Sequence, residues 1–128
     1  MTRPVWHLDR VTLGRAGEGH ARRFLESRGY VFVGANWHCP AGELDLVMTH
    51  GDELVFVEVK TRRGERAGRP DDAVGAAKAR RLLLAGERFV AEHTEWQTAI
   101  WRIDLVAISL RDDGAIDAVR HYENVIGI

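Results

Sequence analysis

The stretch Gly42-Glu-Leu-Asp-Leu-Val-Met-Thr-His-Gly-Asp-Glu-Leu-Val-Phe-Val-Glu-Val-Lys60 decides the fold expected for this chain of 128 residues. Two apolar, β-rich runs flank Gly51-Asp52, a residue pair that favours a two-residue hairpin turn. With this pair at the tip, His50 faces Glu53 and the two runs form antiparallel strands. The sequence therefore predicts a β-hairpin with a defined register over residues 42–60.

The predicted register places four charged side chains at the open end of the hairpin. Asp45 lies across from Glu58, and Glu43 lies across from Lys60. Because side chains alternate along a strand, all four emerge on one face of the sheet. The other face is apolar and needs burial, so a slip of one residue would send the carboxylates into the core. The apolar face consists of Leu44, Leu46, Met48, Val55, Val57 and Val59.

The pair Asp45 and Glu58 is a local conflict, because like charges directly opposite each other destabilise a sheet. Conflicts of this kind concentrate at functional sites. A hard, oxygen-ligated cation such as Mg²⁺ or Mn²⁺ would resolve it. With Lys60 beside such an ion, the trio suits metal-assisted cleavage of a phosphodiester. The alternative interpretation is a solvated ion-pair cluster on an exposed sheet face, and hairpin geometry alone favours neither.

Composition places the chain among soluble globular proteins, with 45% hydrophobic and 29% charged residues. The length suits a single domain over residues 11–128, preceded by a flexible arm at residues 1–10. No run is long or apolar enough to span a membrane or to serve as a signal peptide. The single cysteine, Cys39, fits a reducing cytoplasm. A net charge of −1 excludes a globally basic DNA-coating protein.

The remaining elements follow from periodicity and turn residues. A helix is expected from Thr12 to about Arg28, with Gly29 ending it. The predicted order is α-β-β-β-α-β-β. Beyond the first helix and the hairpin, it comprises a strand at 30–36, loops at 37–41 and 61–71, a helix from Asp71 or Asp72 to about His93, a strand at 100–109, a turn at Asp113-Gly114 and a strand at 116–122.

Several further charged residues have two interpretations. Glu18 either pairs with Arg22 one turn along its helix or points across the sheet toward Asp45 and Glu58, and spacing alone favours the pair. The arginine-rich loop 61–71 is either a solvated charge run or a flap that contacts phosphates, and its position after Lys60 favours the flap. The basic residues considered for a phosphate backbone are Arg62, Arg63, Arg66, Lys78 and Arg81.

Taken together, these residues resemble the YraN-like family of predicted endonucleases within the PD-(D/E)XK nuclease superfamily. The bare Asp…Glu-X-Lys pattern is weak, but the full set is specific and extends over most of the chain. The residues that carry the resemblance are Gly14-Arg-Ala-Gly-Glu18, Gly29-Tyr30, Asn36-Trp37, Gly42-Glu-Leu-Asp45, Val55-Phe-Val-Glu-Val-Lys-Thr-Arg62, Lys78 and Arg102-Ile-Asp104.

The resemblance implies an α/β restriction-endonuclease-like core, in which helices flank a central mixed sheet, similar to Holliday-junction resolvases. It also implies that Asp45 and Glu58 hold the divalent metal, that Lys60 assists catalysis and that Glu18 joins them. The Val59 carbonyl is a candidate third ligand.

The function expected from this resemblance is a Mg²⁺- or Mn²⁺-dependent DNA endonuclease for branched, flapped or single-stranded regions, in repair or recombination. Symmetric cutting of a junction would require a homodimer. The alternative is a non-catalytic protein that keeps the nuclease fold and binds nucleic acid or docks a partner.

Overall fold

The computed structural model describes residues 10–63 and 74–126. No helix in these two ranges is long and apolar enough to cross a lipid bilayer. The elements, in chain order, are α1 (Arg10–Ser27), β1 (Val31–Cys39), β2 (Gly42–His50), β3 (Glu53–Arg63), α3 (Ala76–Glu92), the 3₁₀ turn η2 (Thr94–Trp96), β4 (Trp101–Leu110) and β5 (Ile116–Tyr122).

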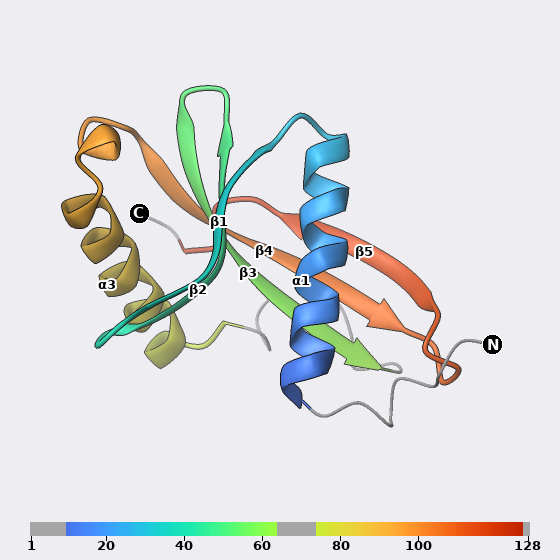
Figure 1. Cartoon of the computed structure of the whole chain (residues 1–128). Helices are drawn as coiled ribbons and strands as arrows, with labels where there is room; N and C mark the ends of the chain where they lie inside the picture. Colours follow the sequence, from blue (N-terminus) through green and yellow to red (C-terminus); the bar gives the residue numbers. More distant parts are fainter. Residues whose placement is uncertain (1–9, 64–73, 127–128) are drawn as a thin grey trace.

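The strands form one mixed five-stranded sheet in the order β1-β2-β3-β4-β5. Neighbours pair antiparallel except β3 and β4, which are parallel and are connected through α3. A parallel pair needs a crossover connection, and a helix that packs on the sheet supplies it. Figure 1 shows α1 and α3 on either side of the sheet. This is the mixed sheet flanked by helices that the sequence predicted, and it is consistent with a restriction-endonuclease-like core.

Each face of the sheet has its own apolar core. Ala21 and Leu25 of α1 pack on Leu46, Met48, Val55 and Val57, which confirms most of the predicted apolar face. Leu82, Ala85 and Phe89 of α3 pack on the opposite face, against Val47, Leu54, Phe56 and Ile103. The hairpin is therefore buried on both faces, and its charged residues lie near the edge of the α3 core.

Several sequence predictions are confirmed at their boundaries. The hairpin register is as expected from His50 opposite Glu53 as far as Leu46 opposite Val57, but the predicted pairs Asp45–Glu58 and Glu43–Lys60 lie beyond the end of the ladder. Gly29 follows α1 with a φ of +90°, a conformation that suits glycine after a helix end. Gly114 takes a φ of +88° in the predicted turn, and β5 spans the predicted residues 116–122.

Other boundaries were wrong. β3 continues through Arg62 and Arg63, because these residues pair with Ser109 and Leu110 of β4 instead of starting a loop. β1 likewise runs on to Cys39 through the loop predicted at 37–41. The rest of the predicted flap lies outside the described residues, as do Asp71 and Asp72. α3 begins at Ala76 with Gly75 as its N-cap, so no aspartate caps it. Residues 1–9 of the predicted arm also lie outside the described part, and Arg10 is the first residue of α1.

Leu44 corrects the predicted face assignment. It is buried in the α3 core, whereas Leu46, two residues along the same strand, is buried in the α1 core. Strict alternation would place both residues on one face. Asn36 of β1 lies between the pairs Ala35–Leu46 and Trp37–Leu44 and has a φ of +53°, so the backbone of β1 departs from regular strand conformation beside this segment of β2.

Candidate functional site

Strands β2 and β3 stop pairing where the charged residues begin. The paired register ends at Leu46 and Val57, although β2 continues back to Gly42 and β3 continues to Arg63. Beyond that point the Asp45 side chain accepts a hydrogen bond from the backbone N–H of Val59, with 2.9 Å between Oδ2 and N. A carboxylate oxygen thus takes the place of a backbone carbonyl, and it holds Asp45 against β3.

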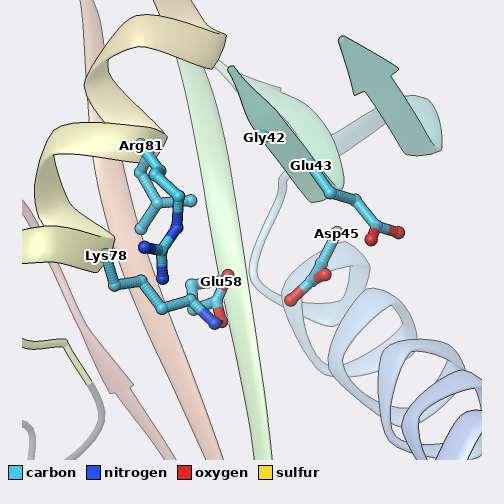
Figure 2. A pocket seen from close by; sticks show the side chains of 7 residues that line it. Gly42, Glu43, Asp45, Glu58, Lys78 and Arg81 are labelled. Atoms are coloured by element: carbon cyan, nitrogen blue, oxygen red, sulfur yellow. The ribbon is translucent and has the colours of Figure 1, made fainter. Parts of the chain in front are cut away.

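A pocket of about 170 Å³ opens beside this break in the ladder. Its walls come from the start of β2, from β3 and from the first turns of α3: Gly42, Glu43, Asp45, Glu58, Lys78, Arg81 and Leu82. Figure 2 shows Lys78 and Arg81 extending from α3 toward Glu58, whereas the Glu43 carboxylate points away from Glu58. β2 lies against α3 at Gly42, where an added Cβ would come to 3.4 Å, about van der Waals contact, from both Cβ and the carbonyl oxygen of Arg81.

Glu58 is the buried acid of the pocket, with 4% of the residue exposed. Burial, followed by the negative charge of Asp45, raises the pKa of Glu58 to about 7, against the opposing hydrogen bond and charge of Lys78. Burial disfavours a charged carboxylate, and a second carboxylate nearby disfavours it further. The pocket therefore contains two close carboxyl groups whose joint ionisation is unfavourable without additional positive charge.

Lys78 supplies positive charge from α3. Its ammonium forms an ion pair with Oε1 of Glu58, and about a third of the lysine side chain remains exposed. Sequence reasoning considered Lys78 only as a contact for a phosphate backbone and missed this pairing. A signal was present, because Lys78 is one of two lysines in a chain that otherwise uses arginine.

Lys60 is a half-buried residue two positions after Glu58 on β3. Burial, followed by the charge of Lys78, lowers the pKa of Lys60, while the charges of Glu58 and Asp45 act in the opposite direction. Lys60 therefore interacts electrostatically with the charged residues of the pocket, although it does not line the pocket.

Two other candidate carboxylates, Glu18 and Glu43, lie on α1 and β2. Glu18 is half-buried on α1. It follows Gly17, where a Cβ would overlap the Thr61 hydroxyl and approach Val59, so α1 crosses β3 closely beside Lys60. Glu43 lines the pocket but faces His38 of β1, with 3.7 Å between Oε1 and Nε2.

The basic residues are spread over two elements. Arg62 is half-buried and Arg63 is exposed at the end of β3, and Arg81 is exposed on α3. Arg66 lies outside the described residues.

The donor set can be tested against a divalent cation. Within residues 10–63 and 74–126, no group of three or more Asp, Glu, His or Cys side chains is placed to hold a metal ion. Two carboxylates, Asp45 and Glu58, are close together in a pocket large enough for a cation and several waters, since one water occupies about 30 Å³ of liquid. Mg²⁺ is commonly bound through one or two carboxylates, with waters and substrate phosphates completing its shell. The residues present therefore fit a weak Mg²⁺ or Mn²⁺ site that substrate would help to complete.

A second charged network lies on the α1 side of the sheet. Asp104 is fully buried on β4 and accepts hydrogen bonds from Arg102 Nε at 2.9 Å, from His121 Nε2 at 2.8 Å and from the Asn124 N–H at 2.9 Å. Arg102 also pairs with Glu53 and donates to the Tyr30 hydroxyl at 2.8 Å. These contacts connect Tyr30 with β3, β4 and β5 and surround the buried charge of Asp104 with donors, so the network serves the fold.

Comparison with known proteins identifies the family. The family described as "Uncharacterised protein family UPF0102" matches residues 17–108, which include both lysines, Asp45 and Glu58. The chain belongs to the UPF0102 family. A UPF0102 protein of Roseiflexus castenholzii is 46% identical over 101 residues, covering 79% of this chain and 82% of the relative.

Two further UPF0102 proteins are similar over most of their length. That of Ectopseudomonas mendocina is 41% identical over 109 residues, covering 85% of this chain and 92% of the relative. That of Beutenbergia cavernae is 44% identical over 113 residues, covering 88% and 94% respectively. The family expected from the sequence motifs is thereby confirmed, and its description assigns no activity.

Proposed function

We propose that this UPF0102 protein is a metal-dependent endonuclease that hydrolyses phosphodiester bonds in structured DNA. The observation that carries the proposal is the closeness of the Asp45 and Glu58 carboxyl groups in a pocket where the β2–β3 ladder ends. Two carboxyl groups held together at the cost of mutual repulsion are poorly explained by folding alone. Placement in the PD-(D/E)XK nuclease superfamily, which the sequence motifs suggest, agrees with the same residues.

Asp45 and Glu58 are the proposed metal ligands, with the Val59 carbonyl as a third. Both carboxyl groups face the pocket, and the hydrogen bond from the Val59 N–H occupies only one Asp45 oxygen. A bound Mg²⁺ or Mn²⁺ would supply a Lewis acid for the phosphate and lower the pKa of a water nucleophile.

Lys60 and Glu18 have the supporting roles in this proposal. Lys60 stabilises the negative charge that develops on the phosphate, since the carboxylates hold the reaction centre near its ammonium. Glu18 orients the attacking water, because the close contact of Gly17 with β3 brings this part of α1 beside the Glu58–Lys60 segment.

The DNA backbone would lie along the end of β3 and the start of α3. Arg62 and Arg63 end β3, and Lys78 and Arg81 project from α3 into or beside the pocket. Together with Arg66 they are the proposed phosphate contacts. Backbone contacts of this kind position DNA without reading its sequence, which suits a substrate recognised by its structure.

A second candidate function has one observation in its favour. Lys78 already neutralises Glu58, and the described residues contain no metal cluster of three or more Asp, Glu, His or Cys side chains. A protein that keeps the nuclease fold but only binds nucleic acid, or docks a partner, would also have these features. Cleavage therefore has to be measured.

The test is cleavage of four-way, flapped, single-stranded and duplex DNA with Mg²⁺ or Mn²⁺, by wild type and by Lys60→Ala. We expect wild type to cut one of the branched substrates. Lys60→Ala should lower the rate by about 10²–10³, the usual cost of losing one donor that stabilises the transition state. DNA affinity, measured by fluorescence anisotropy, should change little because several arginines share the ground-state contacts.

Two further variants sharpen this test. Lys60→Arg should restore only part of the rate, because a planar guanidinium cannot replace a compact ammonium beside a metal-bound water. Arg88→Ala, an exposed α3 residue paired with Glu92, should cut DNA at the wild-type rate. Equal cleavage by wild type and Lys60→Ala would contradict the catalytic role, and no cleavage of any substrate would favour the binding function.

A further inference from the structure

The ion pair between Lys78 and Glu58 joins a partly exposed lysine to a buried carboxyl group. Glu58 is almost fully buried, and Lys78 reaches it from a different layer of the protein. A buried carboxylate is costly unless a positive charge or several donors accompany it. In the structure this positive charge is the Lys78 ammonium.

The position of Lys78 in its helix is unfavourable by itself. It is the third residue of α3, whose first turn contains no acidic residue. The N-terminus of a helix carries partial positive charge, which disfavours a cation there. Lys78 also adds to the positive charge that lowers the pKa of Lys60, so two ammonium groups already share the neighbourhood of Glu58. A lysine that only faced solvent would gain nothing from a position at a helix N-terminus and close to a second ammonium group.

We propose that Lys78 is an electrostatic placeholder, whose ammonium takes the cation position beside Glu58 in the metal-free protein and leaves it when a divalent ion binds. This inference rests on the proposed metal-dependent function. The argument rests on charge repulsion and on shared contacts. A divalent ion on Asp45 and Glu58 would be repelled by the ammonium groups of both Lys78 and Lys60. The Lys78 ammonium also contacts the Glu58 carboxylate, which the ion would use as a ligand. Lys78 can leave without backbone movement, because its four-carbon stem is flexible and part of it is exposed. Its ammonium is then available to a DNA phosphate.

The inference predicts that Lys78 weakens metal binding. A charge-assisted hydrogen bond that must break before binding lowers the apparent affinity by about ten- to a hundredfold. Mn²⁺ titration of Lys78→Met, followed by the electron paramagnetic resonance signal of free Mn²⁺ at pH 8 without DNA, should therefore show binding at least about tenfold tighter than wild type. Methionine keeps the length of the side chain and removes the charge.

Arg81→Met is the matched control. Arg81 lines the same pocket from the same helix, so its loss removes one positive charge without removing the ion pair to Glu58. We expect this variant to bind Mn²⁺ within about threefold of wild type, because a partly solvated charge acts weakly. Lys78→Gln, which keeps a donor for Glu58, should lie between wild type and Lys78→Met and provides a second measurement if the methionine variant does not fold.

The outcomes separate this inference from the proposed function. Tighter Mn²⁺ binding by Lys78→Met than by Arg81→Met supports the placeholder. Equal or weaker binding by the Lys78 variants, with wild type binding Mn²⁺ normally, overturns the placeholder and leaves the metal-dependent function standing. Failure of wild type, Lys78→Met and Lys78→Gln alike to bind Mn²⁺ overturns both.

Discussion

Asp104 and Glu58 are buried carboxyl groups on neighbouring strands, and they have opposite environments. Asp104 on β4 is 0% exposed and accepts hydrogen bonds from Arg102, His121 and the backbone of Asn124. Glu58 on β3 is 4% exposed, has the ammonium of Lys78 as its ion-pair partner and lies close to a second carboxyl group, Asp45. One acid is surrounded by donors, and the other is partly opposed by a like charge.

The two pKa values move in opposite directions for this reason. Burial alone would raise the pKa of Asp104, but the hydrogen bonds from His121, Arg102 and Asn124 together hold it below its usual range. Burial also raises the pKa of Glu58, and Asp45 raises it further, to about 7. Asp104 has enough donors around it to stabilise its negative charge. Glu58 does not, and a raised pKa of this kind is more common at binding or catalytic sites than in a purely structural ion pair.

The largest expected effect comes from breaking the saturated network. Asp104→Asn removes the charge that Arg102 and His121 surround, and it leaves the largely buried Arg102 with less compensation. Removing one partner of a buried ion pair usually costs about 3–5 kcal/mol. We expect the free energy of unfolding to fall by about that amount, measured by urea denaturation followed by circular dichroism.

Asp117→Asn is the control for this loss. Asp117 is an exposed β5 residue that lies 3.6 Å from the Arg111 guanidinium. Surface pairs contribute about 0–1 kcal/mol, so this variant should be nearly as stable as wild type. Similar losses in both variants would show that Asp104 has no special place in the fold.

The next effect is the dependence of stability on pH that the raised pKa of Glu58 should produce. Its folded pKa of about 7 lies above the ordinary value of 4.5, so the folded state holds the proton more tightly than the unfolded state. Stability from this group is therefore present below about pH 4.5 and falls as the pH rises toward 7, by about 1.4 kcal/mol per pH unit for one proton. Glu58→Gln should remove this decline, measured as the difference from wild type in urea unfolding at several pH values.

Two variants define the cause of that decline. Asp45→Asn removes the negative charge beside Glu58 and should lower the folded pKa of Glu58. The decline in stability should then end at a lower pH, and the metal-free protein should be more stable than wild type near pH 8. Glu87→Gln, an exposed α3 change, should follow wild type at every pH. Only the difference between variants is informative, because it isolates the contribution of the exchanged residue from that of the rest of the protein. Equal pH profiles for wild type and Glu58→Gln would contradict the raised pKa.

The smallest expected effect concerns the arginines that end β3. Arg62→Ala with Arg63→Ala should weaken binding to branched DNA several-fold. The plot of log affinity against log salt concentration should also become less steep, by about one unit of slope for each phosphate that is no longer neutralised. The measurement is fluorescence anisotropy over a salt series, with Arg88→Ala on α3 as the matched single-charge control. An unchanged slope would show that DNA does not pass this end of β3.

Local residue patterns determined most of the elements. Turn chemistry at Gly51-Asp52 and the alternation on either side determined the register of β2 and β3, because both act over a few residues. The helical stripe and Gly29 likewise located the end of α1. The sequence also predicted that Asp45 and Glu58 lie close together, because both residues come directly after the last pair of that ladder, Leu46 and Val57.

Tertiary structure decided what depends on partners distant in the sequence. Arg62 and Arg63 became strand residues because β4, more than forty residues later, pairs with them. Leu44 is buried in the α3 core beside Asn36 of β1, whose φ is positive, and alternation along β2 could not show this. The contact of Lys78 with Glu58 and the donors around Asp104 depend on how α3 and β5 pack. The periodicity of a single segment carries no information about which distant side chain will face it, and packing alone settles that choice.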